Sequence, residues 1–269
     1  MRSGLSWLAT LLGLALSGCA SAPRPQADSR AEPVAERDPR AVQPERPTVA
    51  THAGTVAPGF LEIESGIEAD RNEDRSRALL VPTVLKVGLA PRAQLGVQLP
   101  VQSATGVALG AGDIAVGVKW RLTDDHPLLA RFAVLPSVKL STGGARGSGT
   151  TDVGLLLIDS RSLGPASIDL NAGVVRHGVG DNESNTATFW TAAGGMPVYQ
   201  DFGWQLELFG YPGTGGGSGT PAIVGLLTGP TLAVARELSV DAGIIAPLHG
   251  PQPRALYVGF VANLGRIGR

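Results

Sequence analysis

The sequence GAGDIAVGVKWRLTDDHPLLARFAVLPSVKLST, residues 110–142, decides the fold. It predicts two long strands joined by a tight polar turn at residues 123–127. Apolar and polar residues alternate along both strands, and this period of two is typical of a strand with one apolar and one polar face. The apolar faces hold Ile114, Val116, Val118, Trp120 and Leu122 in the first strand and Phe132, Val134, Val138 and Leu140 in the second.

The length of these strands favours a membrane protein. Strands of soluble proteins usually have about 5–6 residues, whereas a tilted strand needs roughly 9–11 residues to cross a bilayer. Alternating segments recur from Phe60 to the end of the chain. Short turns are expected at residues 90–92, 123–127, 162–165, 200–201 and 236–237, and longer loops rich in glycine or charge at 70–76, 104–112, 142–151, 177–185, 211–220 and 248–253. We therefore predict an all-β fold, a closed antiparallel up-and-down transmembrane barrel of about 12 strands.

The first residues resemble a bacterial secretory signal. Arg2 precedes a short apolar core, and residues 16–19, Leu-Ser-Gly-Cys, resemble the lipobox of bacterial lipoproteins. This predicts a signal peptide over residues 1–18 and lipid attachment at Cys19, the only cysteine of the chain. The resemblance implies that Ala20 directs the lipoprotein to the outer membrane. Ordinary signal cleavage near Ala22 is the alternative, although Pro23 would then follow the cut.

Between the signal and the barrel the chain is rich in proline. Residues 19–58 mix prolines with scattered charges and show no apolar period, so we predict a lipid-anchored disordered linker there and the barrel over residues 59–269. An even number of strands places both ends of a barrel on the same rim. Because the short-turn rim of such barrels is periplasmic, we expect the N-terminus and the linker in the periplasm.

Several motifs resemble a known family. They are Gly-Asp-x-x-x-Gly-x-Lys at residues 112–119 followed by Trp-Arg-Leu, Leu-Pro-Ser-Val-Lys-Leu-Ser-Thr-Gly at 135–143, Gly-Thr-Thr-Asp at 149–152, and the closing residues 258–264. Over residues 59–269 the chain resembles the family of outer-membrane transporters named for the meta pathway of phenol degradation. The resemblance implies a bacterial outer-membrane barrel that passes small, hydrophobic or aromatic molecules. A lipidated N-terminus departs from the simplest barrel of this kind.

The sequence does not indicate an enzyme. None of the histidines, His52, His126, His177 and His249, has a catalytic partner at convincing spacing, and the pair of His177 with Ser184 would span a loop. The sequence shows no Cys/His cluster for zinc, and we expect no metal and no cofactor. The net charge of −1 also argues against nucleic acid as a partner. The expected partners are outer-membrane lipid and a small-molecule solute.

If the apolar faces meet lipid, the polar faces line the lumen. The residues expected to point inward are Glu62, Glu64, Asp113, Lys119, Arg121, Arg131, Lys139, Asp169, Asn171, Glu207 and Asp241. They either line a narrow aqueous path or pair across the lumen and fill it. Eight strands give a barrel filled by side chains and sixteen leave a channel, so a count near twelve does not decide between the two.

Two observations oppose this interpretation. Period-two alternation does not say which face is inside, so a lipid-tethered soluble β-barrel or sandwich, acting as a binding or scaffold module of the periplasm, is the alternative. Prolines also fall inside or near the expected strands, where each removes a hydrogen-bond donor. They are Pro82, Pro100, Pro136, Pro197 and Pro230, and Pro136 lies near the middle of its strand.

Overall fold

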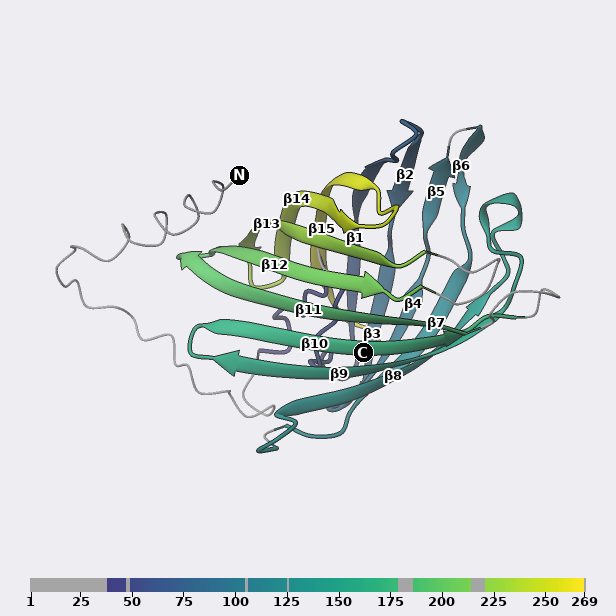
Figure 1. Ribbon diagram of the computed structural model, residues 1–269. Helices are drawn as coiled ribbons and strands as arrows, with labels where there is room; N and C mark the ends of the chain where they lie inside the picture. The colour runs from purple at the N-terminus through teal and green to yellow at the C-terminus, as the bar shows by residue number, and fades with distance from the viewer. Residues whose placement is uncertain are drawn as a thin grey trace, which may run out of the picture. The chain divides into compact units, whose positions relative to one another are not determined.

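The computed structural model describes residues 38–46, 49–104, 106–124, 126–178, 186–213 and 221–268. In these residues the regular structure is almost entirely β, with one short 3-10 helix, η1 (Gly144–Arg146) (Figure 1). The predicted signal, Cys19 and Ser184 lie outside the described residues. The strands are β1 (Phe60–Arg71), β2 (Arg77–Val81), β3 (Val84–Ala90), β4 (Ala93–Gln98), β5 (Val101–Ala104), β6 (Val107–Ala111), β7 (Ile114–Arg121), β8 (Arg131–Leu140), β9 (Asp152–Leu163), β10 (Ala166–Arg176), β11 (Thr186–Tyr199), β12 (Phe202–Tyr211), β13 (Ile223–Ala235), β14 (Leu238–His249) and β15 (Arg254–Arg266).

The sheet closes on itself. Every pair of neighbouring strands is antiparallel, and β15 pairs with β1 along its whole length, from Phe60 opposite Arg266 to Arg71 opposite Arg254. Three spanning segments are each divided into two strands, β2 with β3, β5 with β4 and β6 with β7, so the fifteen strands make twelve spanning segments. The predicted closed barrel of about 12 strands is confirmed. Both ends of the barrel lie on the rim of the short turns.

The three divided segments are neighbours, and their breaks lie at the same level. Pro82 and Pro100 occupy two of the breaks and lack the N–H that would continue the ladder. Single hydrogen bonds bridge this level, from Leu99 N to Thr83 O at 2.7 Å and from Gly112 N to Pro100 O at 2.8 Å. The wall therefore bends here, and β2, β5 and β6 rise together beyond it (Figure 1). The predicted loop over residues 104–112 is wrong for Val107–Ala111, which pair with β5 as β6.

The other prolines also interrupt a ladder on one side only. Pro136 pairs with Leu155 of β9, while its β7 side has no paired residues between Gly117–Ser137 and Trp120–Val134. Pro197 lies at a register shift between β11 and β12, and Pro230 at a gap between β13 and β14. Each missing N–H thus faces a place where the ladder is already open.

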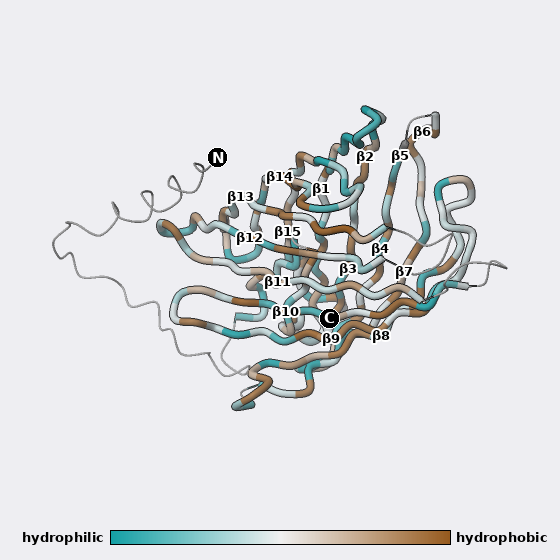
Figure 2. Tube along the Cα trace, viewed as in Figure 1, coloured by the Kyte–Doolittle hydropathy of each residue, from teal (hydrophilic) through white to brown (hydrophobic). Residues whose placement is uncertain are grey.

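The outer surface of the barrel is apolar. Trp120 is 59% exposed, and Leu157, at the middle of β9, is 41% exposed, while their sequence neighbours on the other face are covered. Along the tube in Figure 2 apolar residues follow the strands, and hydrophilic residues gather in the loop after β1. A soluble barrel would bury these apolar side chains, so the soluble alternative is not favoured. Within the described residues no helix is long and apolar enough to cross a membrane.

The cost of a charged substitution on this surface should depend on its depth in the bilayer. Leu157→Arg, at mid-strand, should lower the free energy of unfolding in lipid by about 2–4 kcal/mol, since an arginine at the midplane loses its hydration. Leu163→Arg, on the same face at the end of β9, should cost about 0–1 kcal/mol. Denaturant titration of both variants in lipid bilayers measures the difference. Equal costs would contradict a membrane-spanning β9.

Candidate functional site

The described residues before β1 lie inside the barrel. We call residues 38–46 and 49–57 the plug segment. It begins at the short-turn rim, where Asp38 pairs with Arg236 at 2.6 Å and Asn263 Nδ2 donates to Pro39 O at 3.2 Å. The N–H of Arg40 and the guanidinium of Arg236 lower the pKa of the Asp38 carboxyl, so this contact remains charged at neutral pH. Val42 N then donates to Arg236 O at 3.0 Å, and the segment passes inward.

Carboxylates of the wall bind the backbone of the plug segment. Glu62 accepts a hydrogen bond from Gln43 N and Glu64 one from Glu45 N, both at 2.8 Å. The alternation of β1 puts these two carboxylates on one face, two residues apart, and the extended plug segment presents amides at the same spacing. Both carboxylates are almost completely buried.

Glu207, on β12, repeats this arrangement at the middle of the barrel. Its two carboxylate oxygens accept hydrogen bonds from the consecutive amides of Val49 and Ala50, each at 2.8 Å. The Glu207 side chain is completely buried. A buried carboxylate is costly unless its oxygens are hydrogen-bonded, and here the backbone of the plug segment supplies both donors.

Neutral side chains bind further backbone groups of the plug segment. Asn171, on β10, accepts from Thr51 N at 2.7 Å and donates to Thr51 O at 2.9 Å, as a neighbouring strand would. The acceptors thus come from strands all around the sheet, which places the plug segment in the lumen. Two further bonds of this kind join Ala53 N to Ser160 Oγ and Val56 N to Gln94 Oε1, each at 2.8 Å.

Two buried lysines complete the set of buried polar side chains that bind the plug segment. We call this set the polar ring: Glu62, Glu64, Lys86, Lys119, Asn171 and Glu207. Lys86 pairs with Glu62 at 2.5 Å, pairs with Glu64, and donates to Gln43 O at 2.5 Å. Lys119 pairs with Glu45 of the plug segment and donates to His52 O at 2.8 Å and Gly54 O at 3.0 Å. Both lysine side chains are 1% exposed. Lumen cations therefore bind the carbonyls of the plug segment, while lumen carboxylates bind its amides.

Small residues let the plug segment approach the wall closely. At Gly88 a Cβ atom would lie 2.5 Å from Val56 O, so any larger residue would collide with the plug backbone. On β8 and β9 Ala53 packs against Ala133 and Ile158, and these residues are completely buried. The contact is tight on both sides, as in a protein interior.

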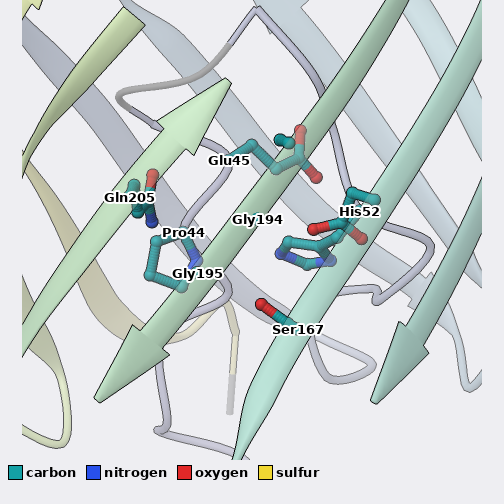
Figure 3. Close-up of a pocket in the computed structure, with 9 residues that line it drawn as sticks. Pro44, Glu45, His52, Ser167, Gly194, Gly195 and Gln205 are labelled. Atoms are coloured by element: carbon teal, nitrogen blue, oxygen red, sulfur yellow. The ribbon is translucent and has the colours of Figure 1, made fainter. Parts of the chain in front are cut away.

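Little space remains beside the plug segment at this level. A cavity of about 40 Å³ lies between its Pro44, Glu45 and His52 and the wall residues around Ser167 and Gln205 (Figure 3). About 10–15 Å³ is enough for one water molecule, so this cavity holds a few waters and no solute of useful size. The plug segment therefore fills the barrel here.

On strands β12 to β15 part of the inward face is apolar instead. Leu227 is the cross-strand partner of Glu207, so it shares the inward face. It belongs to a buried cluster against which Val49 of the plug segment packs. We call this the apolar cluster: Phe209, Leu227, Ile245, Ala255 and Tyr257. The sequence analysis assigned only polar residues to the lumen and did not identify it.

A polar network ties the long-loop rim together. Asp113 accepts hydrogen bonds from the amides of the loop after β8, and Lys139 pairs with Asp113 at 3.5 Å and Asp152 at 2.7 Å. His177 also contacts Asp152, with 2.9 Å between Nδ1 and Oδ2. The sequence spacing did not indicate this contact, because strand pairing brings residues 152 and 177 together across β9 and β10.

The residues predicted to face inward fall into three groups. The largest surrounds the plug segment: Glu62, Glu64, Lys119, Arg121, Asn171, Glu207 and Asp241, all buried. Asp113 and Lys139 belong to the long-loop rim. Arg131 and Asp169 are half-buried in the wall, where Asp169 accepts from Ser160 Oγ at 2.5 Å. Sequence reasoning missed Lys86, Gln94 and Ser160.

The plug segment itself is the main difference from the sequence analysis. Its residues fall within the stretch predicted as a disordered linker to residue 58, whereas the described part of that stretch, from Asp38 on, is held inside the barrel. Residues 19–37 of the predicted linker lie outside the described residues. In the part of the chain that the structure describes, no group of histidine, cysteine and acidic residues could hold a metal ion.

Comparisons with known proteins support the fold. The COG4313 outer membrane channel from Pseudomonas putida F1 superposes with a TM-score of 0.64 at 13% identity, over 79% of this chain and 98% of that one. The KdgM porin superposes with a TM-score of 0.50 at 11% identity, over 74% and 98%. No family model and no curated protein matches the chain, so the resemblance to the phenol meta pathway family remains a prediction. The fold is that of outer-membrane β-barrels.

Glu207 provides a test of the plug contacts. Glu207→Gln leaves one oxygen to accept both amides and removes the charge, which should weaken the contact by about 1.5–3 kcal/mol. Hydrogen exchange at the Val49 and Ala50 amides should accelerate about ten- to a hundred-fold.

The matched control is Glu237→Gln in the exposed turn before β14, which should leave exchange at both amides unchanged. Unchanged exchange in Glu207→Gln as well would mean that the Glu207 carboxylate does not hold the plug segment.

Proposed function

We propose that this chain is an outer-membrane channel for small hydrophobic or aromatic molecules, closed in this state by its plug segment. The observation that carries the proposal is the division of the lumen into a filled polar ring and an apolar cluster. The fold shared with outer-membrane channels supports it, although identities of 11–13% extend to fold only.

The apolar cluster favours a hydrophobic solute. Ligand sites are usually apolar hollows with a few polar groups, and a fully polar lumen would instead favour ions and sugars. Phe209 and Tyr257 belong to the buried cluster of the inward face against which Val49 packs. An aromatic solute that reaches this level from the long-loop side can stack there, and it then meets the plug segment.

Transport through the lumen requires the plug segment to move. The polar ring binds it mostly through backbone amides and carbonyls, which water can replace on release. Once the plug segment leaves, the buried ionic side chains of the ring become hydrated, so release does not strand a charge in an apolar environment. The hydrogen bonds therefore stabilise the closed state, and water can replace them when the plug segment is released.

Planar-bilayer recording tests the channel. A chain lacking residues 38–57 should show discrete single-channel steps, whereas the full chain should show much smaller conductance, since the plug segment fills the polar ring. A chain with residues 38–57 replaced by a glycine–serine stretch of the same length should conduct like the deletion, which separates loss of contacts from a shorter linker.

Folding of each variant is checked by heat-modifiable gel mobility. A deletion variant that is folded and silent would overturn the channel proposal. Liposome uptake of benzyl alcohol against a sugar of similar size tests the solute class, and we expect faster entry of the aromatic probe.

We also propose that the mature chain begins at a lipidated Cys19 and that the plug segment enters from the periplasm. The lipobox resemblance and the position of Asp38 on the short-turn rim support this. Cys19→Ser should abolish incorporation of labelled palmitate in cells while the barrel still shows its heat-modifiable band. Undiminished labelling of Cys19→Ser would contradict lipid attachment.

A further inference from the structure

Arg46 is a side chain of the plug segment that inserts into the barrel wall. Its guanidinium lies over Gly66 of β1 and Gly259 of β15, which are direct partners in the sheet. A Cβ atom at Gly66 would lie 2.6 Å from Arg46 Nη2, and one at Gly259 would lie 2.5 Å from the same atom. The two facing glycines therefore leave a hollow that the guanidinium fills.

An acidic residue lies beside this hollow. Asp241, on β14, is the cross-strand partner of Gly259, and its Oδ1 is 3.5 Å from Arg46 Nη2. The Arg46 and Asp241 side chains are 12% and 4% exposed. We call Gly66, Gly259 and Asp241 the socket. A flat hollow with a carboxylate at its edge suits a planar cation that carries N–H donors.

The hydrogen bonding of Arg46 in the socket is incomplete. Charge-assisted hydrogen bonds of this kind measure about 2.7–2.9 Å, whereas the Arg46–Asp241 contact is 3.5 Å. Arg46 Nε is buried and has no hydrogen-bond partner among the described residues. The fixed backbone of the plug segment limits how the guanidinium can be placed. A free guanidinium group has no such tether and can move closer to Asp241.

The wall beyond the socket is acidic. Glu68 and Asp70 follow Gly66 on the same face of β1, toward the long-loop rim. Within the described chain neither carboxylate forms an ion pair with a basic side chain. Acidic side chains on a lumen wall attract cations toward the socket from that side.

We propose that the socket is a binding site for guanidinium groups, which Arg46 occupies within the chain and which a guanidinium-bearing solute can occupy from solution. The carrying observation is the pair of facing glycines beside Asp241. The proposal goes beyond the channel function, because it assigns a cationic ligand class to a defined place on the wall.

Competition with Arg46 sets the conditions of the test. A tethered group has an effective concentration in the millimolar range, so a free ligand competes poorly with Arg46 in the full chain. The variant Arg46→Ala empties the socket. Hydrogen exchange at the Glu45 and Val49 amides, which donate to Glu64 and Glu207 on either side, then reports how firmly the plug segment is held.

In Arg46→Ala we expect exchange at these amides to rise about tenfold, because the ion pair with Asp241 and the packing of the guanidinium against the two glycines are lost. Methylguanidinium should restore the slower exchange in a saturable manner. N-methylurea, which has the planar shape without the charge, and tetramethylammonium, which has the charge without N–H donors, should have no effect.

Second substitutions locate the effect. Asp241→Asn combined with Arg46→Ala should abolish the rescue, and Gly259→Ala should weaken it, since the three atoms nearest to the new methyl group all belong to Arg46. Gly96→Ala is the matched lumen control, because its Cβ would meet only Gly117 O at 3.9 Å. It should leave the rescue intact.

Equal rescue by all three additives, or rescue that survives Asp241→Asn, would overturn the proposal. Unchanged exchange in Arg46→Ala would overturn it too, since an occupied socket must contribute to holding the plug segment. The readout needs only a folded barrel, as shown by heat-modifiable mobility. Its failure is therefore distinct from a failure of the channel proposal, which rests on conductance.

Discussion

Hydrogen bonds between buried wall side chains and the backbone of the plug segment are the constraint on which the structure depends. Glu62, Glu64 and Glu207 point into the lumen and are almost without solvent contact. A carboxylate in such a place is tolerated only when donors surround its oxygens. The plug segment supplies amide donors to all three. The barrel and the segment before it therefore form one hydrogen-bonded unit.

The width of the barrel explains why a segment of chain is needed. An eight-stranded barrel is filled by its own side chains, and a sixteen-stranded one leaves open water. At twelve, side chains such as Lys86 and Lys119 reach inward and bind the plug segment. An extended segment of small residues fits the remaining space, and Ala53 touches one wall while the chain at Val56 touches another. Occupation of the lumen thus follows from strand number and side-chain length.

The sequence predicted the wall well because the membrane imposes a simple rule on it. Every second residue from Ile114 to Leu122 is apolar, and similar alternation in the other spanning segments allows most of the faces, turns and strands to be predicted from the sequence. The sequence alone did not explain a proline at position 136, near the middle of a strand. In the structure its missing N–H faces a gap in the ladder with β7.

The sequence did not predict the plug segment, because the wall side chains bind mainly its backbone groups. Amides and carbonyls are the same in every sequence, so residues 38–57 carry no period that marks them as bound. The run of small residues after Val49 is a weak signal of a confined segment. Lys86 was missed for a related reason, since it lies between Leu85 and Val87 in a mainly apolar run. Arg46, in contrast, is bound through its side chain. The sequence did not predict this contact, because Gly66 and Gly259 become neighbours only when β1 pairs with β15.

The position of Ala53 tests the central claim most directly. It is completely buried against Ala133 and Ile158, so in a Cys19→Ser background a cysteine placed by Ala53→Cys should be unreactive toward a water-soluble maleimide in the folded barrel. It should react fully after unfolding. A cysteine placed at the exposed turn residue Glu237 should react in both states. Rapid labelling at residue 53 in the folded barrel would contradict the account, because the segment would then lie outside the lumen.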